Sequence, residues 1–236
     1  MELERDWARV LSDLAERPVD DIVFGGDIGA ASAHARFFRS LEKTGRPVRF
    51  VPGNHDVAAR LRSRFAGPVS DEALYALVPT LPPWSMLLLD SSTGELGVKQ
   101  SRWLDGQLRS CGPVLIFVHH PVLPVDTAID RLYPLVARDA VRERLQTHRH
   151  PVLVLCGHYH LEDEQTLGNV TQLVTPAVSF QVRKEAKEKL ELDDDNYGYR
   201  LVHIEGTQVC SEVIRIARPR RRSSPGPDGL LTFRRG

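Results

Sequence analysis

Short apolar segments alternate with amphipathic segments along most of this chain, and this alternation limits the fold more than any other feature. Apolar runs of strand length lie at 21–24, 48–51, 85–90, 114–118, 152–155, 170–174, 199–204 and 209–216. Helical spacing of apolar residues predicts helices over 3–16, 33–43, 58–65, 71–77, 99–109 and 137–147. Alternating strands and helices predict an α/β fold, and the late strands favour either a mixed sheet or a two-sheet β-sandwich covered by helices.

The charge distribution divides the chain near residue 216. The whole chain has 31 Lys or Arg and 31 Asp or Glu, so its formal net charge is zero, which excludes a generally basic nucleic-acid binder. Residues 217–236 contain six Arg and one Asp together with Pro, Gly and Ser. We therefore expect one domain over 1–216 and a basic, disordered tail over 217–236, with binding of an anionic partner by the tail as the alternative. The charged segment 183–198 is expected to be an exposed helix or a loop insertion.

Cysteine content and hydropathy favour a cytoplasmic protein. The three cysteines are too few and too widely spaced for a disulfide framework or a thiolate zinc site, which favours a reducing compartment. No apolar run approaches the roughly 20 residues that span a bilayer, and the N-terminus lacks a signal pattern. We expect no association with a membrane.

Polar motifs follow four of the predicted strands. A GGD segment ends at Asp27, GNHD spans 53–56, HHP spans 119–121 and GHYH spans 157–160. Sites in open α/β sheets form beyond the carboxyl ends of strands, so these motifs should meet at one edge. Their glycines allow tight turns and close approach of the side chains.

Carboxylate, amide and imidazole groups together are the ligands of a divalent metal such as Mn, Fe or Zn. The absence of thiolates argues against a closed structural zinc site. An aspartate can bridge two cations about 3.5–4 Å apart, as in two-metal hydrolases. Each motif alone also fits a polar turn or a capped core histidine, but the four together favour a metal site. The remaining histidines are expected to be surface or structural residues: His34, His148, His150 and His203.

The series GGD, GNHD, HHP and GHYH resembles the calcineurin-like metallophosphoesterase superfamily over residues 17–216. This resemblance implies a two-sheet sandwich flanked by helices, an αββα arrangement, with a dinuclear metal centre. Further segments are similar to the branch of 3',5'-cyclic-AMP and other cyclic-nucleotide phosphodiesterases: LLLDSS at 87–92, the WL pair at 103–104, TPAVSFQ at 175–181 and GYR at 198–200.

The resemblance also implies a role for each motif residue. Asp27 would bridge the two metals. Asn54, His119 and His158 would hold one metal, and His160 would hold the other.

The remaining motif residues would act on the substrate or support those that do. His55 would face the phosphate with Asn54 beside it, and would stabilise the transition state or protonate the leaving oxygen. Asp56 would orient His55 or anchor the loop. His120 would be at most a neighbour of the ligands.

One departure from the family pattern concerns its first strand, which ends in Asp-x-His. The segment Leu11–Ala15 offers Asp13 but has Ala15 in place of the histidine. Eight residues separate Asp13 from Ile22, fewer than the dozen or so that a parallel crossover needs. We therefore expect Asp13 to be exposed on the first helix and the first strand to be absent, which leaves one metal with only Asp27 and His160. Either the natural start lies upstream of Met1, or the chain is a mononuclear or inactive relative.

Three functions remain open at this point. The first is a metal-dependent phosphodiesterase for cyclic nucleotides or similar small phosphodiesters, with two divalent metals, or one in this chain. The second is a non-catalytic module that binds a nucleotide or a protein. The third is a monoesterase or nucleotidase with the same chemistry. Exposed edge strands would also allow a homodimer.

Overall fold

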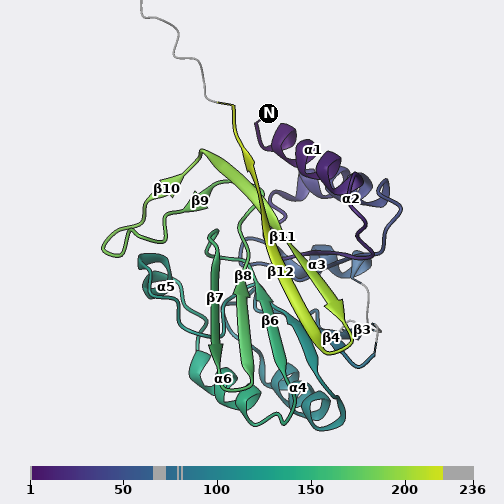
Figure 1. Ribbon diagram of the computed structural model, residues 1–236, viewed down its shortest axis with the longest axis vertical. Coiled ribbons are helices and arrows are strands. Elements are labelled where there is room, and N and C mark those ends of the chain that lie inside the picture. The colour runs from purple at the N-terminus through teal and green to yellow at the C-terminus, as the bar shows by residue number, and fades with distance from the viewer. Residues whose placement is uncertain (1, 66–72, 79, 81, 220–236) are drawn as a thin grey trace, which may run out of the picture.

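A six-stranded mixed sheet forms the centre of the computed structural model, which describes residues 2–65, 73–78, 80 and 82–219 (Figure 1). The strand order is β3-β4-β5-β6-β8-β7. The four inner strands are parallel and the two edge strands are antiparallel to their neighbours. The strands are β3 (Ala76–Val78), β4 (Ser85–Leu88), β5 (Val114–Phe117), β6 (Val152–Cys156), β7 (Asp163–Leu167) and β8 (Val170–Val174).

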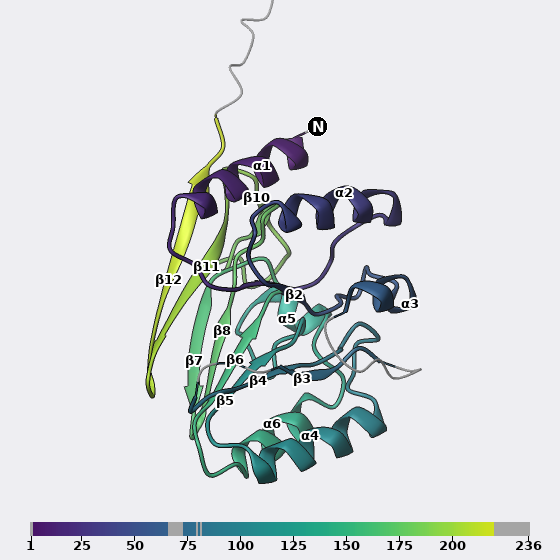
Figure 2. The same ribbon diagram turned by 90° about the vertical axis from the view of Figure 1, so that its right-hand side faces the viewer.

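A second strand layer packs against this sheet and consists of separate two-stranded pieces. They are parallel β1 (Ile22–Phe24) and β2 (Val48–Phe50), and antiparallel β11 (Asn196–Glu205) and β12 (Gln208–Ala217). Val202 and Ile204 of β11 pack on Leu115, Leu153 and Leu155 of the central sheet. Figure 2 shows the β11–β12 hairpin alongside the central sheet. A short pair, β9 (Gln181–Val182) with β10 (Leu192–Asp193), completes the strands.

Helices cover both outer faces. In the described residues the α-helices are α1 (Glu2–Ala15), α2 (Ala31–Glu42), α3 (Ala58–Leu61), α4 (Val98–Ser110), α5 (Ala128–Leu132) and α6 (Arg138–Gln146), and a 3₁₀ helix, η1 (Arg62–Arg64), follows α3. Leu104 of α4 and Leu145 of α6 are buried in one core with Ile116 of the central sheet. On the other side, Phe38 of α2 packs with Phe50 of β2. Figure 2 shows α1 and α2 at one end and α4 and α6 at the other, which confirms the predicted α/β arrangement of helix, sheet, sheet and helix.

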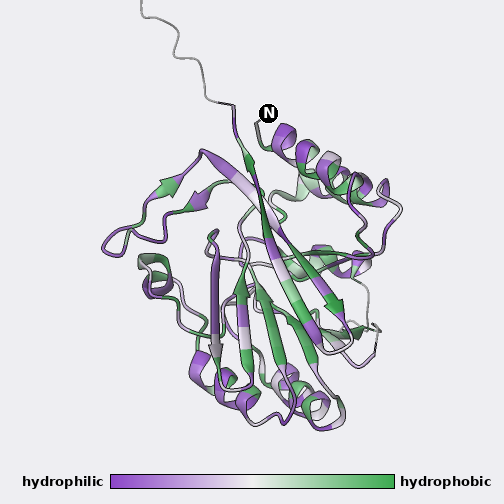
Figure 3. Cartoon of the chain, in the orientation of Figure 1, coloured by the Kyte–Doolittle hydropathy of each residue, from purple (hydrophilic) through white to green (hydrophobic). Residues whose placement is uncertain are grey.

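The structure replaces one predicted helix with a strand and contains an edge strand that was not predicted. The helix predicted over 71–77 is wrong, because Ala76–Val78 is strand β3; residues 71 and 72 lie outside the described residues. Ala76 and Val78 are buried while Leu77 between them is 45% exposed, which is the two-residue period of a strand. Strand β7 was not predicted because its sequence, DEQTL, is polar; it is an edge strand and is hydrophilic in Figure 3.

The described residues contain no strand before β1, in agreement with the predicted absence of a first strand. Asp13 lies in α1, but it is half-buried rather than exposed, and it accepts hydrogen bonds from Arg17 and the Tyr199 hydroxyl. In the described part of the chain, β1 pairs with β2 alone, so its other edge is unpaired. A cavity of about 1730 Å³ is lined by residues of β1 and of β11 and continues to Asp27 and His160.

The last described strand continues one residue past the predicted boundary at 216. Strand β12 continues to Ala217, and Arg218 forms ion pairs with Asp6 of α1 and with Asp194. Most of the predicted tail, 220–236, lies outside the described residues. The charged segment 183–198 is not a helix: it contains the loop between β9 and β10, strand β10 itself and the start of β11. Among the residues that the structure describes, no helix is both long and apolar enough to cross a membrane.

Candidate metal centre

Four side chains from the ends of four strands meet at one ring nitrogen, His119 Nε2. This atom lies 3.1 Å from Asn54 Oδ1, 3.3 Å from Asp27 Oδ2 and 3.2 Å from His158 Nδ1. Asp27 follows β1, Asn54 follows β2, His119 follows β5 and His158 follows β6. The structure thus brings together the four residues that were predicted to share one metal.

Backbone geometry explains why these loops carry glycine. Gly26 has φ +102°, a conformation that side chains rarely adopt, and a Cβ there would lie 2.7 Å from the His119 ring. A Cβ on Gly53 would lie 2.1 Å from Asp27 Oδ1. Asp27 and His158 themselves have φ near +59°, a strained backbone of the kind found at functional sites. Only glycine at 26 and 53 lets the two loops approach this closely.

Asp56 holds the first two loops together. Its Oδ2 accepts the main-chain N–H of Asp27 at 2.8 Å and of Gly53 at 2.9 Å, and its Oδ1 accepts that of Ile28 at 2.9 Å. These contacts match the loop anchor that was one of its two predicted roles. No contact between the side chains of Asp56 and His55 is found in the described residues.

Main-chain carbonyls fix the orientation of each imidazole. His119 Nδ1 lies 2.7 Å from the Gly25 carbonyl oxygen, His158 Nε2 lies 3.1 Å from that of Tyr133, and His160 Nδ1 lies 3.1 Å from that of Phe180. When these nitrogens donate to the carbonyls, the other nitrogen of each ring carries a lone pair that is available to a metal. Metal-binding histidines in proteins are oriented in this way. The sequence contained no signal for these three carbonyls, because a main-chain acceptor can belong to any residue type.

Burial and the charge of neighbouring groups keep His158 and His160 neutral. Burial, and then the charge of His119, lower the pKa of His158 to about 4. Burial also lowers the pKa of His160. Burial would raise the pKa of the Asp27 carboxyl, but the hydrogen bond and charge of His119 hold it well below its ordinary value. An ionised Asp27 beside neutral His158 and His160 is the protonation state in which these groups bind a cation.

The donor set fits one divalent cation. Ligand atoms of Asp27, His119 and His158 lie within 4.8 Å of one another, and the amide oxygen of Asn54 joins them. His160 is outside this group, so a second cation would have Asp27 and His160 from the described ligands. His55 is exposed and donates its main-chain N–H to Asp27 Oδ1 at 2.9 Å.

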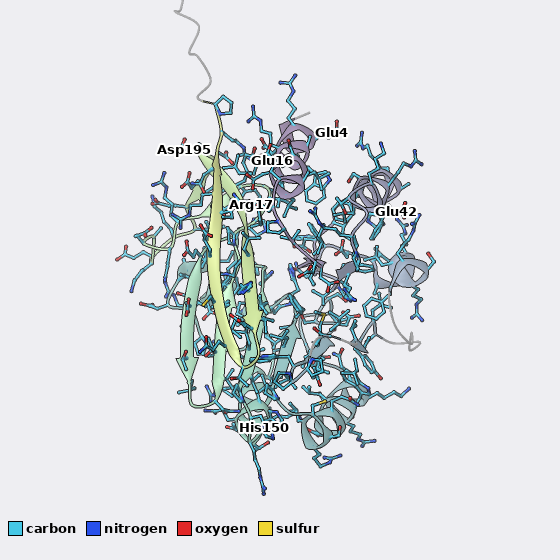
Figure 4. All side chains as sticks on the ribbon, turned by 45° about the vertical axis from the view of Figure 1, so that its right-hand side comes forward. Glu4, Glu16, Arg17, Glu42, His150 and Asp195 are labelled. Carbon is cyan, nitrogen blue, oxygen red and sulfur yellow. The ribbon has the colours of Figure 1, made fainter. Side chains whose placement is uncertain are left out.

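Histidines outside the motifs occupy other places. His34 contacts the Gly29 carbonyl, and His148 is buried against that of Gly112. His150 precedes β6 and so lies at the opposite end of that strand from His158; Figure 4 shows it far from Glu4 of α1. His203 is exposed on β11. These positions fit the predicted surface and structural roles.

His120 is adjacent to the centre but faces a different partner. Its Nδ1 lies 2.9 Å from Ser91 Oγ, and its ring centroid is 4.1 Å from that of His158. Burial, and then the charges of His158 and His119, lower the pKa of His120 to about 3. It is therefore a buried, neutral neighbour of the candidate ligands.

The free energy of unfolding of the metal-free chain is expected to fall as pH drops from about 6.5 to about 4. His120 and His158 stay neutral in the folded chain, whereas unfolded histidine titrates near pH 6.5. The unfolded chain therefore binds more protons in this window, and stability present above pH 6.5 is lost on acidification. Each proton contributes roughly 1 to 2 kcal/mol per pH unit. Urea unfolding at pH 7, 6 and 5 measures the slope, which His120→Asn should reduce by about one proton; an unchanged slope would count against a buried neutral His120.

The sequence of this chain is similar to those of known phosphoesterases. A sequence model of the Calcineurin-like phosphoesterase family matches residues 3–162, more than half of the chain. The 3',5'-cyclic adenosine monophosphate phosphodiesterase CpdA of Escherichia coli is 27% identical over 222 residues, which are 89% of this chain and 79% of that protein. A probable glycerophosphodiester phosphodiesterase, GpdQ of Arcobacter nitrofigilis, is 28% identical over 78% of this chain and 73% of its own length.

A solved structure shares the fold. A dimetal phosphatase from Danio rerio superposes with a TM-score of 0.63 at 18% identity, covering 90% of each chain. At this identity the likeness supports the fold alone. Taken with the matched family model and the strand-end ligands, it leads to one assignment: this chain belongs to the calcineurin-like phosphoesterase family.

Proposed function

We propose that this chain is a metal-dependent phosphodiesterase that acts on cyclic nucleotides or similar small phosphodiesters. The observation that carries the proposal is the convergence of Asp27, Asn54 and His158 on His119 Nε2, within 3.3 Å in each case. The names of its relatives support a phosphodiester substrate, both a cyclic nucleotide and a glycerophosphodiester.

In this proposal, some residues of the site would bind the cations and another would act on the substrate. Asp27, Asn54, His119 and His158 would hold a divalent cation, and His160 would contribute to a second. Divalent cations supply charge neutralisation of the phosphate and activation of water when bound. His55 lies on the same loop as Asn54 and its ring is not held in the cluster, so it is the group that would donate a proton to the leaving oxygen or stabilise the transition state.

Replacing His55 with Ala is expected to lower kcat about a hundredfold and to leave bound metal unchanged. General acid catalysis by one side chain contributes on the order of 10²–10⁴-fold, and His55 lies outside the ligand cluster. Steady-state kinetics on a phosphodiester with metal analysis of the same sample measure both effects. His150→Ala, an exposed histidine at the opposite end of β6, is the matched control. Loss of metal together with activity would instead make His55 a ligand.

A non-catalytic module that binds a nucleotide or a protein remains the second candidate. It is favoured by the second cation position, which has only Asp27 and His160 among the described residues. Turnover that Asp27→Asn abolishes would rule it out.

We also propose a cytoplasmic location, supported by three free cysteines, which fit a reducing compartment.

A further inference from the structure

Two exposed aromatic side chains border the metal centre without belonging to its ligand cluster. Tyr133 follows α5 and is 56% exposed, and Phe180 precedes β9 and is 36% exposed. Both line the cavity that also contains Asp27 and His160. Exposed apolar surface that is contiguous and bordered by polar groups marks a ligand-binding or interaction site.

The backbone ties both aromatic residues to the candidate ligands. The carbonyl oxygen of Tyr133 contacts His158 Nε2, and that of Phe180 contacts His160 Nδ1, each at 3.1 Å. The Phe180 ring centroid is 4.6 Å from that of His160. A substrate whose phosphate sits at the metal centre would therefore place its organic group within reach of these rings.

The segments that carry the two rings are joined to each other. An ion pair between Lys187 and Asp126 links the β9–β10 hairpin to the segment before α5, and Figure 1 shows the hairpin and α5 next to each other. Lys184 is also paired, with Asp163 at 2.5 Å. The two segments that carry the rings are thus joined by an ion pair. Lys184 and Lys187 are both paired with carboxylates of the protein.

Two more apolar side chains lie on the same side of the cavity. Leu190 and Leu192 of the hairpin are 42% and 52% exposed and line the same cavity. Contact with these four apolar and aromatic side chains favours a flat, weakly hydrated group over a charged or polyhydroxyl group, whose hydrogen bonds to water would be lost there.

We propose that Tyr133 and Phe180 form an aromatic platform that stacks on the base of a nucleotide, and that the substrate is a nucleoside phosphodiester rather than an alkyl one. This inference rests on the proposed phosphodiesterase function. A nucleobase gains stacking energy on an aromatic ring, whereas a glycerol group has no face to stack. The platform would determine substrate selectivity and would take no part in bond breaking.

The test compares two substrates on the full chain loaded with Mn²⁺. Phe180→Ala and Tyr133→Ala should each raise KM for 3',5'-cyclic AMP about tenfold, with kcat changed less than about threefold, because base stacking contributes roughly this much. KM for glycerophosphoethanolamine should stay within about twofold. Phe180→Leu keeps apolar bulk without the ring and should resemble Phe180→Ala. Leu167→Ala, an exposed apolar residue at the far end of β7, is the control.

Calorimetric binding of AMP to the same variants separates this inference from the proposed function. If the wild-type chain cleaves cyclic AMP but the Ala variants keep its KM, the platform is wrong and the phosphodiesterase stands. If neither diester is cleaved but both Ala variants weaken AMP binding about tenfold, the platform stands and the proposed function fails. Equal losses on both substrates, or AMP binding that the variants leave unchanged, would overturn the platform.

Discussion

Replacing Asp27 with Asn is expected to lower kcat/KM for phosphodiester hydrolysis about a thousandfold and to reduce bound metal. The carboxylate contributes the negative charge of the cluster, and His119 keeps it ionised. Losing a charged ligand of this kind costs several kcal/mol of transition-state stabilisation, and about 4 kcal/mol corresponds to a thousandfold. Steady-state kinetics and metal analysis on the same preparation give the two readouts.

The Asp27→Asn variant tests the carboxylate charge alone because it preserves the local structure. Asn tolerates the positive φ of residue 27 and keeps an oxygen that can accept the His55 main-chain N–H. Thermal unfolding in the absence of metal should therefore stay close to that of the wild type. If the variant folds normally and retains both metal and activity, Asp27 is not a ligand of the metal centre.

Replacing Asp56 with Ala is expected to lower the free energy of unfolding by about 3 kcal/mol. Three main-chain N–H groups, those of Asp27, Ile28 and Gly53, would lose a charged acceptor. Hydrogen bonds to charged groups contribute on the order of 1.5–3 kcal/mol each, and partial exposure of this loop lets water replace some of that. For a chain of this length the melting temperature should fall by about 10 °C.

Metal affinity should fall with stability in the Asp56 variant, because the same bonds align the loops that carry Asp27 and Asn54. Urea unfolding and metal titration measure the two effects. Glu16→Ala, which removes an exposed carboxylate just after α1, should change neither (Figure 4). A stability loss without any change in metal affinity would show that the loops are held in register by other contacts.

The ligand cluster could be predicted from the sequence because its signal is local. Each motif directly follows a buried apolar strand, and parallel strands bring their carboxyl ends to one edge. The four residues predicted to share a metal, Asp27, Asn54, His119 and His158, do come together. The glycines at 26 and 53 also have the close approach that their motifs indicate.

Contacts between distant segments could not be predicted in this way. The carbonyls that orient His158 and His160 belong to Tyr133 and Phe180, 25 and 20 residues away, and carry no sequence signature. Asp13 was expected to be exposed but bonds Tyr199, 186 residues away. Strand β7 was missed because an edge strand does not need apolar residues on both faces.

The most direct measurement is hydrolysis of 3',5'-cyclic AMP by the full chain as Mn²⁺ is titrated, with bound metal quantified in each sample. The proposed function predicts that AMP formation begins with metal binding, saturates with it, and is lost in Asp27→Asn. Metal that binds in an Asp27-dependent way without release of AMP, or of any monoester from other phosphodiesters, would contradict it and leave a binding module.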